Sequence, residues 1–397
     1  MSPAALDGLR PTWTEVDLDR LQANAEEACR LAGSERGLLA VVKADAYGHG
    51  AAAAARAFAD GGASALAVSL LEEALELRAG GIEEPVVILG PLLAEQLAPA
   101  VDAGATPTLY SMALAEALDA EGARRGTALG YHLKIDTGMG RLGIPTDDLG
   151  AFLERIATLK HLRMDGVFTH LPCADDPDAP ITHRQLEDFR VALEAVRARG
   201  HVPTQVHVAN SAAFLRELPG FCNLVRPGLA LYGYSPAPGP IPPGRFAPAL
   251  SLHSRVAQVK RVAAGATVGY GSTWTAARES IIATLPLGYE DGYSRALGNR
   301  AHALVSGRQA PVVGRVSMDL TTLDVTDLPP VQVGDPVLFL GQQSGQSVDA
   351  WDLARWSGTI VWEILCGLGR RMPRLHTRGG CVVEVRATLA GPLPGSR

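Results

Sequence analysis

The stretch LLAVVKADAYGHG (residues 38–50) contains the pattern that decides the fold. It begins with Leu38–Val42, an apolar run with the length and composition of a buried parallel strand, and Lys43 follows directly. Seven more runs of this kind follow along the chain, and they are Leu66–Val68, Val86–Leu89, Thr106–Leu109, Tyr131–Ile135, Leu162–Phe168, Thr204–Val208 and Leu224–Arg226. Short apolar runs that recur in this way predict strands covered on both faces, as in a parallel sheet.

The segments between these runs have helical spacing. Clear examples are Leu71–Ala79, Met112–Arg125 and Arg184–Arg199, and the apolar residues of the last one share a face. Eight strands that alternate with helices predict an α/β fold of the (β/α)8 TIM-barrel type. A doubly wound open sheet is the alternative, because periodicity does not show whether a parallel sheet closes. The count of eight favours closure.

The composition and the hydrophobic pattern of the chain change after the eighth run. Pro236–Pro248 contains six prolines and no helical period, so it predicts a crossing segment. Short β-type runs come next, and they are Leu250–Val262, Ser280–Leu285, Ala301–Val305, Pro311–Val316, Thr321–Val325 and Val337–Leu340. A late helix is expected around Asp349–Trp356. We therefore expect two domains: a barrel over residues 1–243 and a mainly β domain over residues 244–397.

Composition excludes several classes of function. The formal net charge is −6 and the chain has no run rich in Lys and Arg, which argues against nucleic acid or an acidic membrane as a partner. No apolar stretch approaches the length of a membrane span, and the N-terminus lacks the apolar core of a signal peptide. The five cysteines are scattered without a CxxC pair. They predict reduced thiols in a cytoplasmic protein without a metal site.

Functional groups of a barrel gather just past the C-terminal ends of its strands. This rule selects a set of polar residues from five strands: Lys43 and Tyr47 after the first, Lys134, Asp136 and Arg141 at the fifth, His170 after the sixth, Asn210 and Ser211 after the seventh, and Arg226 at the eighth. Each alone has an ordinary structural explanation, such as a solvated lysine or an ion pair. Their joint occurrence on one rim predicts a site.

The residue types of this rim suit an aldehyde cofactor that carries a phosphate. A desolvated lysine such as Lys43 can form a Schiff base with an aldehyde. Phosphate needs backbone N–H groups near helix N-termini. Asn210–Ser211, which open a helix, and Gly228–Leu229, which follow the eighth strand, are placed to supply them. The loops after strands seven and eight are the usual phosphate site of a barrel.

Several segments resemble the motifs of one known family, the alanine racemases. VVKADAYGHG (residues 41–50) resembles the family's lysine signature for pyridoxal 5′-phosphate (PLP). Four more segments are similar to its barrel motifs: HLKIDTGMGRLG (132–143), FTHLPCADD (168–176), ANSAA (209–213) and VRPGLALYG (225–233). Three are similar to its C-terminal motifs: VGYGSTW (268–274), PLGYEDGY (286–293) and GRVSMDL (314–320). The resemblance runs from about Pro11 to Arg374.

The resemblance implies a homodimer that interconverts L- and D-alanine through a PLP aldimine and two bases. Lys43 would hold the cofactor and act on one face of the substrate Cα. Tyr270 of the partner subunit would act on the other face, with His170 as its hydrogen-bonded neighbour. Arg226 would face the pyridine nitrogen, and since arginine only donates, that nitrogen would stay unprotonated. The family role is the supply of D-alanine as a peptidoglycan precursor, although the sequence does not distinguish this from alanine catabolism.

The resemblance also assigns residues around the substrate. Arg141 would bind the PLP phenolic oxygen and the substrate carboxylate, and Lys134 matches a lysine that many members carbamylate. The remaining assignments are Tyr47, Asn210, Ser211, Gly228 and Leu229 at the cofactor, Met318 at the substrate carboxylate, and Asp175, Tyr289, Arg295 and Arg315 in the entry channel. One departure stands out: Trp362 occupies the position of a tyrosine that caps the phosphate in many members.

Four alternatives remain open. Trp362 leaves room for a serine or broad-specificity racemase of the same fold, because small pockets separate such substrates by only about 1–3 kcal/mol. A decarboxylase of basic amino acids fits the C-terminal motifs less well. A non-catalytic PLP-binding protein would not need the β domain that carries Tyr270 and Met318. A cofactor-free aldolase would use Lys43 without PLP, and its purified form would gain no near-visible absorption with PLP.

Overall fold

A computed structural model describes residues 8–218, 220–237 and 245–387, and these residues form two compact units. We call Leu21–Ala46 with Ala51–Ala247 the barrel unit. The described parts of residues 1–20, 47–50 and 248–397 form the second unit, which we call the β unit. Most of the predicted proline-rich crossing, and the expected domain boundary at residue 243, lie outside the described residues.

The barrel unit is built on parallel strands. They are β2 (Gly37–Val41), β3 (Ala65–Val68), β4 (Val86–Ile88), β5 (Ala105–Thr106), β6 (Thr108–Leu109), β7 (Leu129–Asp136), β9 (Leu162–Phe168), β10 (Gln205–His207) and β11 (Leu224–Val225), and β8 (Ile144–Pro145) adds to the edge of β7. β5 pairs with β4, and β6 pairs with β7. Only Pro107 separates β5 from β6, and its carbonyl accepts the His132 N–H at 3.0 Å. Residues 105–109 therefore act as one strand that joins both ends of the sheet into a barrel.

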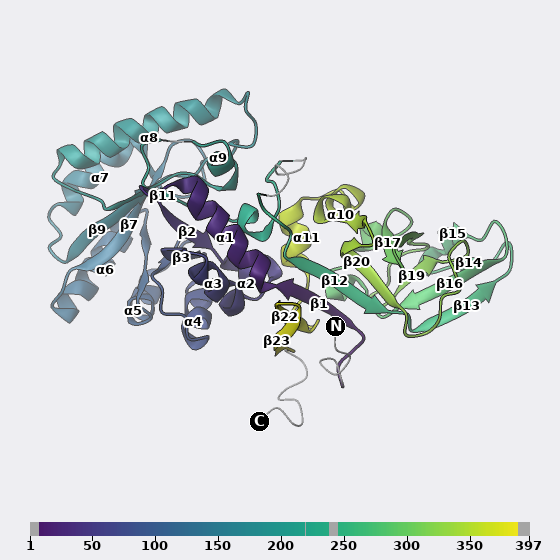
Figure 1. The fold of residues 1–397 in the computed structure, drawn as a ribbon. Coiled ribbons are helices and arrows are strands. Elements are labelled where there is room, and N and C mark those ends of the chain that lie inside the picture. The colour runs from purple at the N-terminus through teal and green to yellow at the C-terminus, as the bar shows by residue number, and fades with distance from the viewer. Residues whose placement is uncertain (1–7, 219, 238–244, 388–397) are drawn as a thin grey trace. The chain divides into compact units, whose positions relative to one another are not determined.

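Helices cover the outside of this barrel (Figure 1). They are α1 (Leu18–Ala32), α3 (Ala51–Asp60), α4 (Leu71–Ala79), α5 (Ala94–Asp102), α6 (Met112–Arg125), α7 (Leu149–Ile156), α8 (Pro180–Ala198) and α9 (Ser211–Leu215). In α8, Phe189, Leu193 and Val196 are buried against the sheet side, as their spacing predicts. All eight predicted strands are present, and the predicted barrel is confirmed over the open sheet.

The β unit contains one large sheet, ordered β18-β17-β20-β12-β1-β22-β23, with β21 paired to β20. Its strands are β1 (Thr12–Asp17), β12 (Leu250–Arg255), β17 (His302–Val305), β18 (Arg308–Pro311), β20 (Pro336–Gln343), β21 (Gln346–Val348), β22 (Arg374–Arg378) and β23 (Cys381–Arg386). A three-stranded sheet holds β13 (Gln258–Val262), β16 (Ser280–Leu285) and β19 (Thr321–Asp324), and β14 (Thr267–Val268) pairs with β15 (Trp274–Thr275). The helices are α10 (Ala350–Ser357) and α11 (Val361–Gly367).

The β unit differs from the sequence prediction in three places. β1 pairs with β12 and β22, although residues 1–243 were expected to form one domain. The predicted run Leu250–Val262 breaks after Arg255, because the first half pairs with β1 and β20 and the second half with β16. The run Pro311–Val316 is not a strand beyond Pro311, since Gly314 takes a φ of 75° that a strand does not allow.

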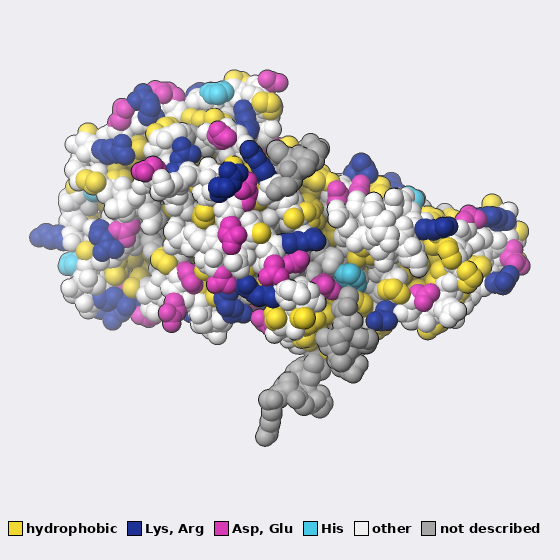
Figure 2. Space-filling model, viewed as in Figure 1, with side chains coloured by type: hydrophobic (Ala, Val, Ile, Leu, Met, Phe, Trp, Pro, Cys, Tyr) yellow, Lys and Arg dark blue, Asp and Glu magenta, His cyan; other side chains and the backbone are white. Residues whose placement is uncertain are grey.

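On the face shown in Figure 2, basic and acidic side chains are interspersed, and neither sign forms a continuous patch. Among the described residues, no helix has the length and apolar character needed to cross a membrane. The same residues contain no group of three or more His, Cys, Asp and Glu side chains that could hold a metal ion.

Candidate active site

Lys43 begins an unusual helix at the C-terminal end of β2. In α2 (Lys43–Gly48), the four residues 44–47 all have positive φ values between 51° and 55°, so the helix is left-handed. None of the four is glycine, and the left-handed conformation costs about 1–2 kcal/mol per residue. Strain of this kind persists only where the surroundings enforce it, and it concentrates at functional sites. The backbone at Lys43 is therefore held in place by its contacts.

Contacts from two elements hold this turn. In the barrel unit, the Glu73 carboxylate accepts hydrogen bonds from the backbone N–H of Ala44 at 2.6 Å, Ser69 at 2.7 Å and Leu70 at 3.1 Å. Glu73 thus caps its own helix, α4, and fixes the residue next to Lys43. In the β unit, the buried Arg374 donates from Nε to the Gly48 carbonyl at 2.9 Å. Both ends of the left-handed turn are anchored.

Arg226 is the centre of the polar contacts inside the barrel. Its side chain is buried, and Nη2 donates to the Thr169 carbonyl at 3.2 Å and to Nδ1 of His170 at 3.2 Å. Nε donates to Nδ1 of His207 at 3.3 Å. The guanidinium also lies 5.8 Å from the centre of the Phe168 ring. Arg226 therefore links the ends of β9, β10 and β11.

The histidines around Arg226 are neutral near pH 7. Burial, followed by the positive charges of Arg226, Arg141, Lys134 and Lys43, holds the pKa of His170 well below its usual value. Burial is also the main reason why the pKa of His207 is well below normal and why that of His132 is lowered to about 4. His132 Nδ1 lies 3.0 Å from His207 Nε2, so one imidazole donates and the other accepts.

Lys134 in β7 has a buried ammonium group that two neighbouring arginines repel. The side chain is 6% exposed and Nζ lies 5.4 Å from the centre of the Phe168 ring. Burial, and then the charges of Arg226 and Arg141, lower the pKa of Lys134 to about 8. The same charges show that Lys134 lies near both arginines. A substantial fraction of this amine is therefore neutral, and hence nucleophilic, at slightly alkaline pH.

The loop that carries Arg141 is organised by Asp136. The Asp136 carboxylate accepts hydrogen bonds from the backbone N–H of Gly138 at 2.9 Å, Met139 at 2.8 Å and Gly140 at 2.9 Å. Three amides on one carboxylate fold the loop back over the end of β7. Arg141, which is exposed, is thereby kept at the rim.

The loops after β10 and β11 meet at one hydroxyl. Ser211 Oγ accepts hydrogen bonds from the Gly228 N–H at 2.9 Å and the Ala230 N–H at 3.2 Å. Asn210 caps α9 through Oδ1, which accepts the Ala213 N–H at 3.0 Å. Two amides from the start of one helical turn thus converge on the first residue of α9, and amides in such positions bind phosphate oxygens well. The residues present fit the phosphate of the cofactor that the sequence analysis suggested.

This amide cluster is tied to the strand that precedes Lys43. Tyr232, in the helical turn Leu229–Tyr232, donates from its hydroxyl to the Val41 carbonyl at 2.8 Å. The Val41 N–H in turn donates to the Pro227 carbonyl at 3.3 Å. The lysine and the amide cluster therefore keep a fixed spacing within the barrel unit.

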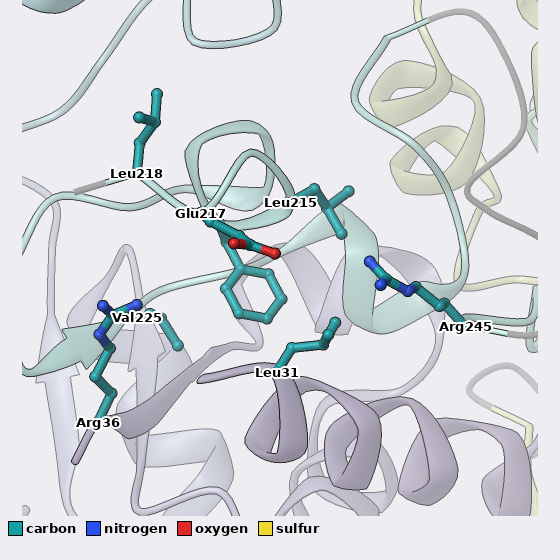
Figure 3. Close-up of a pocket in the computed structure, with 8 residues that line it drawn as sticks. Leu31, Arg36, Leu215, Glu217, Leu218, Val225 and Arg245 are labelled. Atoms are coloured by element: carbon teal, nitrogen blue, oxygen red, sulfur yellow. The ribbon is translucent and has the colours of Figure 1, made fainter. Parts of the chain in front are cut away.

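A small hollow elsewhere in the barrel unit is not part of this site. It is lined by Leu31, Arg36, Phe214, Leu215, Glu217, Leu218, Val225 and Arg245 (Figure 3). Arg36 and Glu217 lie in the segments that enter β2 and β11, so the hollow is at the N-terminal ends of the strands. Its volume of about 10 Å³ has room for no more than about one water molecule.

In the β unit, Tyr270 lies on a tight turn. The turn Tyr270–Ser272 is preceded by Gly269, with a φ of 77°, and contains Gly271, with a φ of 71°. A Cβ on Gly271 would lie 2.9 Å from Nη1 of Arg315, so the turn packs closely on that arginine. The Tyr270 side chain itself is 69% exposed on its own chain. The structure presents this tyrosine outward.

Tyr289 and Met318 lie on two loops that are paired in the β unit. The Tyr289 N–H donates to the Ser317 carbonyl at 3.0 Å, and the Glu290 N–H donates to the Met318 carbonyl at 3.1 Å. Gly288 is required here, because a Cβ would collide with the backbone of Met318. The buried Asp291 supports the pair through Arg10 and Arg371 at 2.5 Å and 2.7 Å. Met318 is half exposed.

The remaining predicted residues fall in two groups. Asp175 is exposed in the loop before α8, and Arg295 is exposed in the β unit. Tyr47 is buried, and the carbonyl of Leu365 in α11 packs against Gly48, the residue that follows it. α11 also carries Trp362, which is half-buried. Tyr47 and Trp362 thus belong to the same unit, and the helix that carries Trp362 packs against the residue after Tyr47.

Sequence reasoning missed Glu73 and His207. Glu73 is the third residue of α4, where a carboxylate commonly caps a helix, and this position was the available signal. His207 ends β10 in the same way that His170 follows β9, so the rule of strand ends also pointed to it.

Comparison with known proteins agrees with this architecture. The model of the alanine racemase N-terminal domain matches residues 16–236, and that of the C-terminal domain matches residues 249–376. The alanine racemase of Symbiobacterium thermophilum is 44% identical over 371 residues, which are 94% of this chain and 98% of the relative. The relative from Geobacter sulfurreducens is 43% identical over 372 residues, covering 92% and 97%.

Solved structures give the same result. The alanine racemase of Bacillus anthracis with bound L-Ala-P has a TM-score of 0.88 at 37% identity, and the match covers 95% of this chain and 97% of that one. That of Bartonella henselae, with covalently bound pyridoxal phosphate, has a TM-score of 0.83 at 28% identity, covering 92% and 99%.

The fold and the site thus define a two-domain barrel enzyme of the isomerase class. More narrowly, the chain belongs to the alanine racemase family, whose members depend on PLP.

Proposed function

We propose that this chain racemises alanine with PLP, and that Lys43 and the partner subunit's Tyr270 are the two bases. The observation that carries the proposal is the convergence of Lys43, Lys134, His170 and Arg226 at the C-terminal rim of the barrel, where burial and then the charges of Arg226 and its neighbours lower the pKa of Lys134 and of His170. Two cationic lysines beside an arginine suit a cofactor that brings phosphate and phenolate charges.

Most of the residues that would hold PLP come from four strand ends of the barrel unit. Ser211, Gly228 and Leu229 would bind the phosphate, with Asn210 holding the start of α9 and with Tyr47 and Trp362 completing the group. Arg226 would face the pyridine nitrogen, and Arg141 the phenolic oxygen. When bound, PLP supplies an aldehyde that bonds to amines and a ring that stabilises negative charge at the substrate Cα.

The two bases have separate tasks. The Lys43 amine would take or return the Cα proton on one face of the substrate, and the Tyr270 phenol would do so on the other. Inversion requires both, because the proton must leave from one side and arrive from the opposite side. Each positioned acid–base group is worth about 10²–10⁴-fold in rate. The left-handed turn after Lys43 would hold the backbone of this residue in place, and so help to position its amine.

Arg226 would influence the reaction through the hydrogen bonds that it donates. A guanidinium donates and cannot accept, so a ring nitrogen facing Arg226 has no proton of its own. The resulting weaker electron withdrawal limits side reactions such as transamination. His170, held at Nδ1 by Arg226, has Nε2 available as a donor toward the phenol of the partner subunit's Tyr270.

The substrate carboxylate would be bound by Arg141 and by the backbone at Met318 of the partner subunit. A carbamate on Lys134 would neutralise part of the positive charge around Arg141 and orient it. Asp175, Tyr289, Arg295 and Arg315 would line the entrance. The outward presentation of Tyr270, Tyr289 and Met318 supports a homodimer, because a base as exposed as Tyr270 needs a second surface to exclude water. We place the enzyme in the cytoplasm as a supplier of D-alanine for peptidoglycan precursors.

Serine is the second candidate substrate, and Trp362 is the reason. Its indole can donate one hydrogen bond through its N–H, but it has no hydroxyl like that of a phosphate-capping tyrosine. Trp362 lies in α11, and the Leu365 carbonyl of this helix packs against Gly48, the residue after Tyr47. The ratio of kcat/KM for alanine and serine decides between a strict and a broad racemase.

The test is to incubate the PLP-loaded protein with L-alanine and follow D-alanine by chiral chromatography. We expect conversion to an equal mixture, and loss of it in Lys43→Ala but not in Lys160→Arg, a change at an exposed lysine outside the site. Wild-type protein that forms no D-alanine, or an unimpaired Lys43→Ala variant, would contradict the proposal.

Cofactor attachment can be tested without turnover. The chain has four lysines, Lys43, Lys134, Lys160 and Lys260. Borohydride reduction of the loaded protein should fix the cofactor mass on the peptide that contains Lys43. A label on any of the other three would show that the anchor is wrongly assigned.

A further inference from the structure

Asn299 occupies a strained position in the β unit and makes two hydrogen bonds from it. It follows the short helical turn Arg295–Leu297 and has a φ of 61°, in the left-handed region. Its Oδ1 accepts the backbone N–H of Gly314 at 2.6 Å. Its Nδ2 donates to Oγ1 of Thr273 at 3.0 Å and lies 3.5 Å from the Thr273 carbonyl. One amide thus joins two separate segments.

The two joined segments both belong to the surroundings of Tyr270. Thr273 closes the turn Tyr270–Ser272, and Gly314 precedes Arg315. Gly314 packs on the carbonyl of Val268, and Gly269 packs on the backbone of Arg315. The turn is therefore held on its N-terminal side by backbone packing. On its C-terminal side Asn299 supplies the link to Gly314.

We propose that Asn299 is a positioning residue that sets the direction in which Tyr270 is presented to the partner subunit. The inference rests on the proposed function, in which Tyr270 is the second base. Tyr270 is 69% exposed, so few residues of its own chain pack against its side chain. The direction of the side chain therefore depends on the backbone of the turn. Without Asn299, Thr273 loses its link to Gly314 and the turn gains freedom to tilt.

A tilt of the turn affects one base only. Proton transfer needs the phenol oxygen within about 3–3.5 Å of its partner, and a misplacement of about 1 Å costs on the order of 10²-fold. Lys43 lies in the barrel unit and does not depend on this turn. The structure therefore predicts a defect on one face of the substrate, with the other face intact.

Asn299→Gly is the informative change. Glycine adopts a φ of 61° without strain, so the backbone is preserved while both side-chain hydrogen bonds are removed. Ser306→Gly is the matched control, because Ser306 also has a positive φ, of 50°, in the turn between β17 and β18, away from Tyr270. Thr273→Val and Thr273→Ser form a second pair, in which only valine loses the acceptor hydroxyl.

The readout separates positioning from general damage. In D2O, racemisation is followed by chiral analysis, and exchange of the substrate α-hydrogen without inversion is followed by mass spectrometry for each enantiomer. Exchange with retention removes one Cα proton and returns one deuteron to the same face, so it requires one base only. Overall racemisation must fall equally from both enantiomers, because the equilibrium constant is fixed at one.

We expect Asn299→Gly to lower racemisation about 10- to 100-fold. Exchange with retention should change by less than about twofold for the enantiomer whose α-hydrogen faces Lys43. Thr273→Val should follow the same pattern more weakly, and Thr273→Ser should restore wild-type behaviour. Bound PLP should match that of Ser306→Gly, and the melting temperature should fall by only a few degrees, because two hydrogen bonds are lost while the fold is kept.

Two results would overturn the inference. Asn299→Gly could racemise like Ser306→Gly, or it could lose exchange of both enantiomers in proportion to racemisation, which is the behaviour of a merely structural residue. Failure of the proposed function looks different: Tyr270→Phe would then racemise normally, or the wild-type protein would form no D-alanine at all.

Discussion

Nη2 of Arg226 donates a hydrogen bond to Nδ1 of His170 across 3.2 Å. Because a guanidinium has no acceptor, this contact requires a lone pair on Nδ1 and places the proton of the neutral imidazole on Nε2. Burial, and then the charge of this arginine, disfavours a second proton and lowers the pKa of His170. Arg226 thereby selects the tautomer of its neighbour and adds to the effect of burial on its charge.

The protein should lose stability as the pH falls from about 6.5 toward 4. An unfolded histidine has a pKa near 6.5, whereas His132 has a folded pKa of about 4. Between these values the unfolded state binds the extra proton, so the free energy of unfolding falls by about 1.36 kcal/mol per pH unit for this one group. His170 and His207 shift in the same direction. Urea unfolding at each pH measures the slope.

The contribution of one histidine can be isolated. His132→Asn should make the slope between pH 6.5 and 4 shallower by about one proton, whereas His183→Asn, at an exposed position, should leave it unchanged. Equal slopes for the two variants would show that His132 is not held neutral by burial.

Lys134 should react with carbon dioxide. With a pKa of about 8, roughly a tenth of its amine is neutral at pH 7, against less than about 0.1% for an ordinary lysine. The neutral amine adds carbon dioxide and releases one proton, and the product carbamate is stabilised by the nearby arginines. Carbon-13 NMR with labelled bicarbonate should show one carbamate signal that is absent in Lys134→Arg and retained in Lys260→Arg. A signal that survives Lys134→Arg would exclude this lysine.

Removal of Glu73 should loosen the turn after Lys43. Glu73→Ala leaves the N–H groups of Ala44, Ser69 and Leu70 without their carboxylate, and loss of such a cap costs about 1–2 kcal/mol of unfolding free energy. We expect a lower melting temperature and a lower stoichiometry of bound PLP. Glu72→Ala, one residue earlier and exposed, is the control. If both variants bind PLP equally, the carboxylate does not support the lysine turn.

Ser211→Ala should weaken PLP binding about tenfold, which corresponds to about 1.4 kcal/mol. The change removes the hydroxyl that gathers the Gly228 and Ala230 amides, so these groups lose their common partner. Titration of the apoprotein with PLP gives the dissociation constant. Ser254→Ala, which removes a buried hydroxyl from the β unit, should lower stability and leave the constant unchanged. An unchanged constant in Ser211→Ala would place the phosphate elsewhere.

The barrel and its rim were predictable because both follow from local rules. Apolar runs of strand length mark buried parallel strands, and parallel strands bring their C-terminal ends to one rim. Lys134, His170 and Arg226 were found in this way without knowledge of their contacts. The electrostatic coupling that distinguishes them required the structure, because it depends on distances between strands that are far apart in sequence.

The features that escaped prediction depend on distant partners. The four residues of the left-handed turn, ADAY, include no glycine that would predict positive φ values. The turn is held by hydrogen bonds from Ala44 to Glu73 and from Arg374 to Gly48. β1 has a strand-like sequence, but its partners β12 and β22 lie more than 200 residues away. Asn299 looks like an ordinary turn residue until its two partners are known.

The place of β1 between β12 and β22 has a consequence for the way the protein is made. Ribosomes add about 5–20 residues per second, so roughly 20–70 s separate the synthesis of β1 from that of β22. The strands of the barrel unit lie between residues 37 and 225, so they can assemble on the ribosome in the meantime. β1 is therefore translated long before either of its partners, and its two edges stay unpaired until β12 and then β22 follow. During that interval both edges of β1 carry backbone N–H and C=O groups that can pair with another chain.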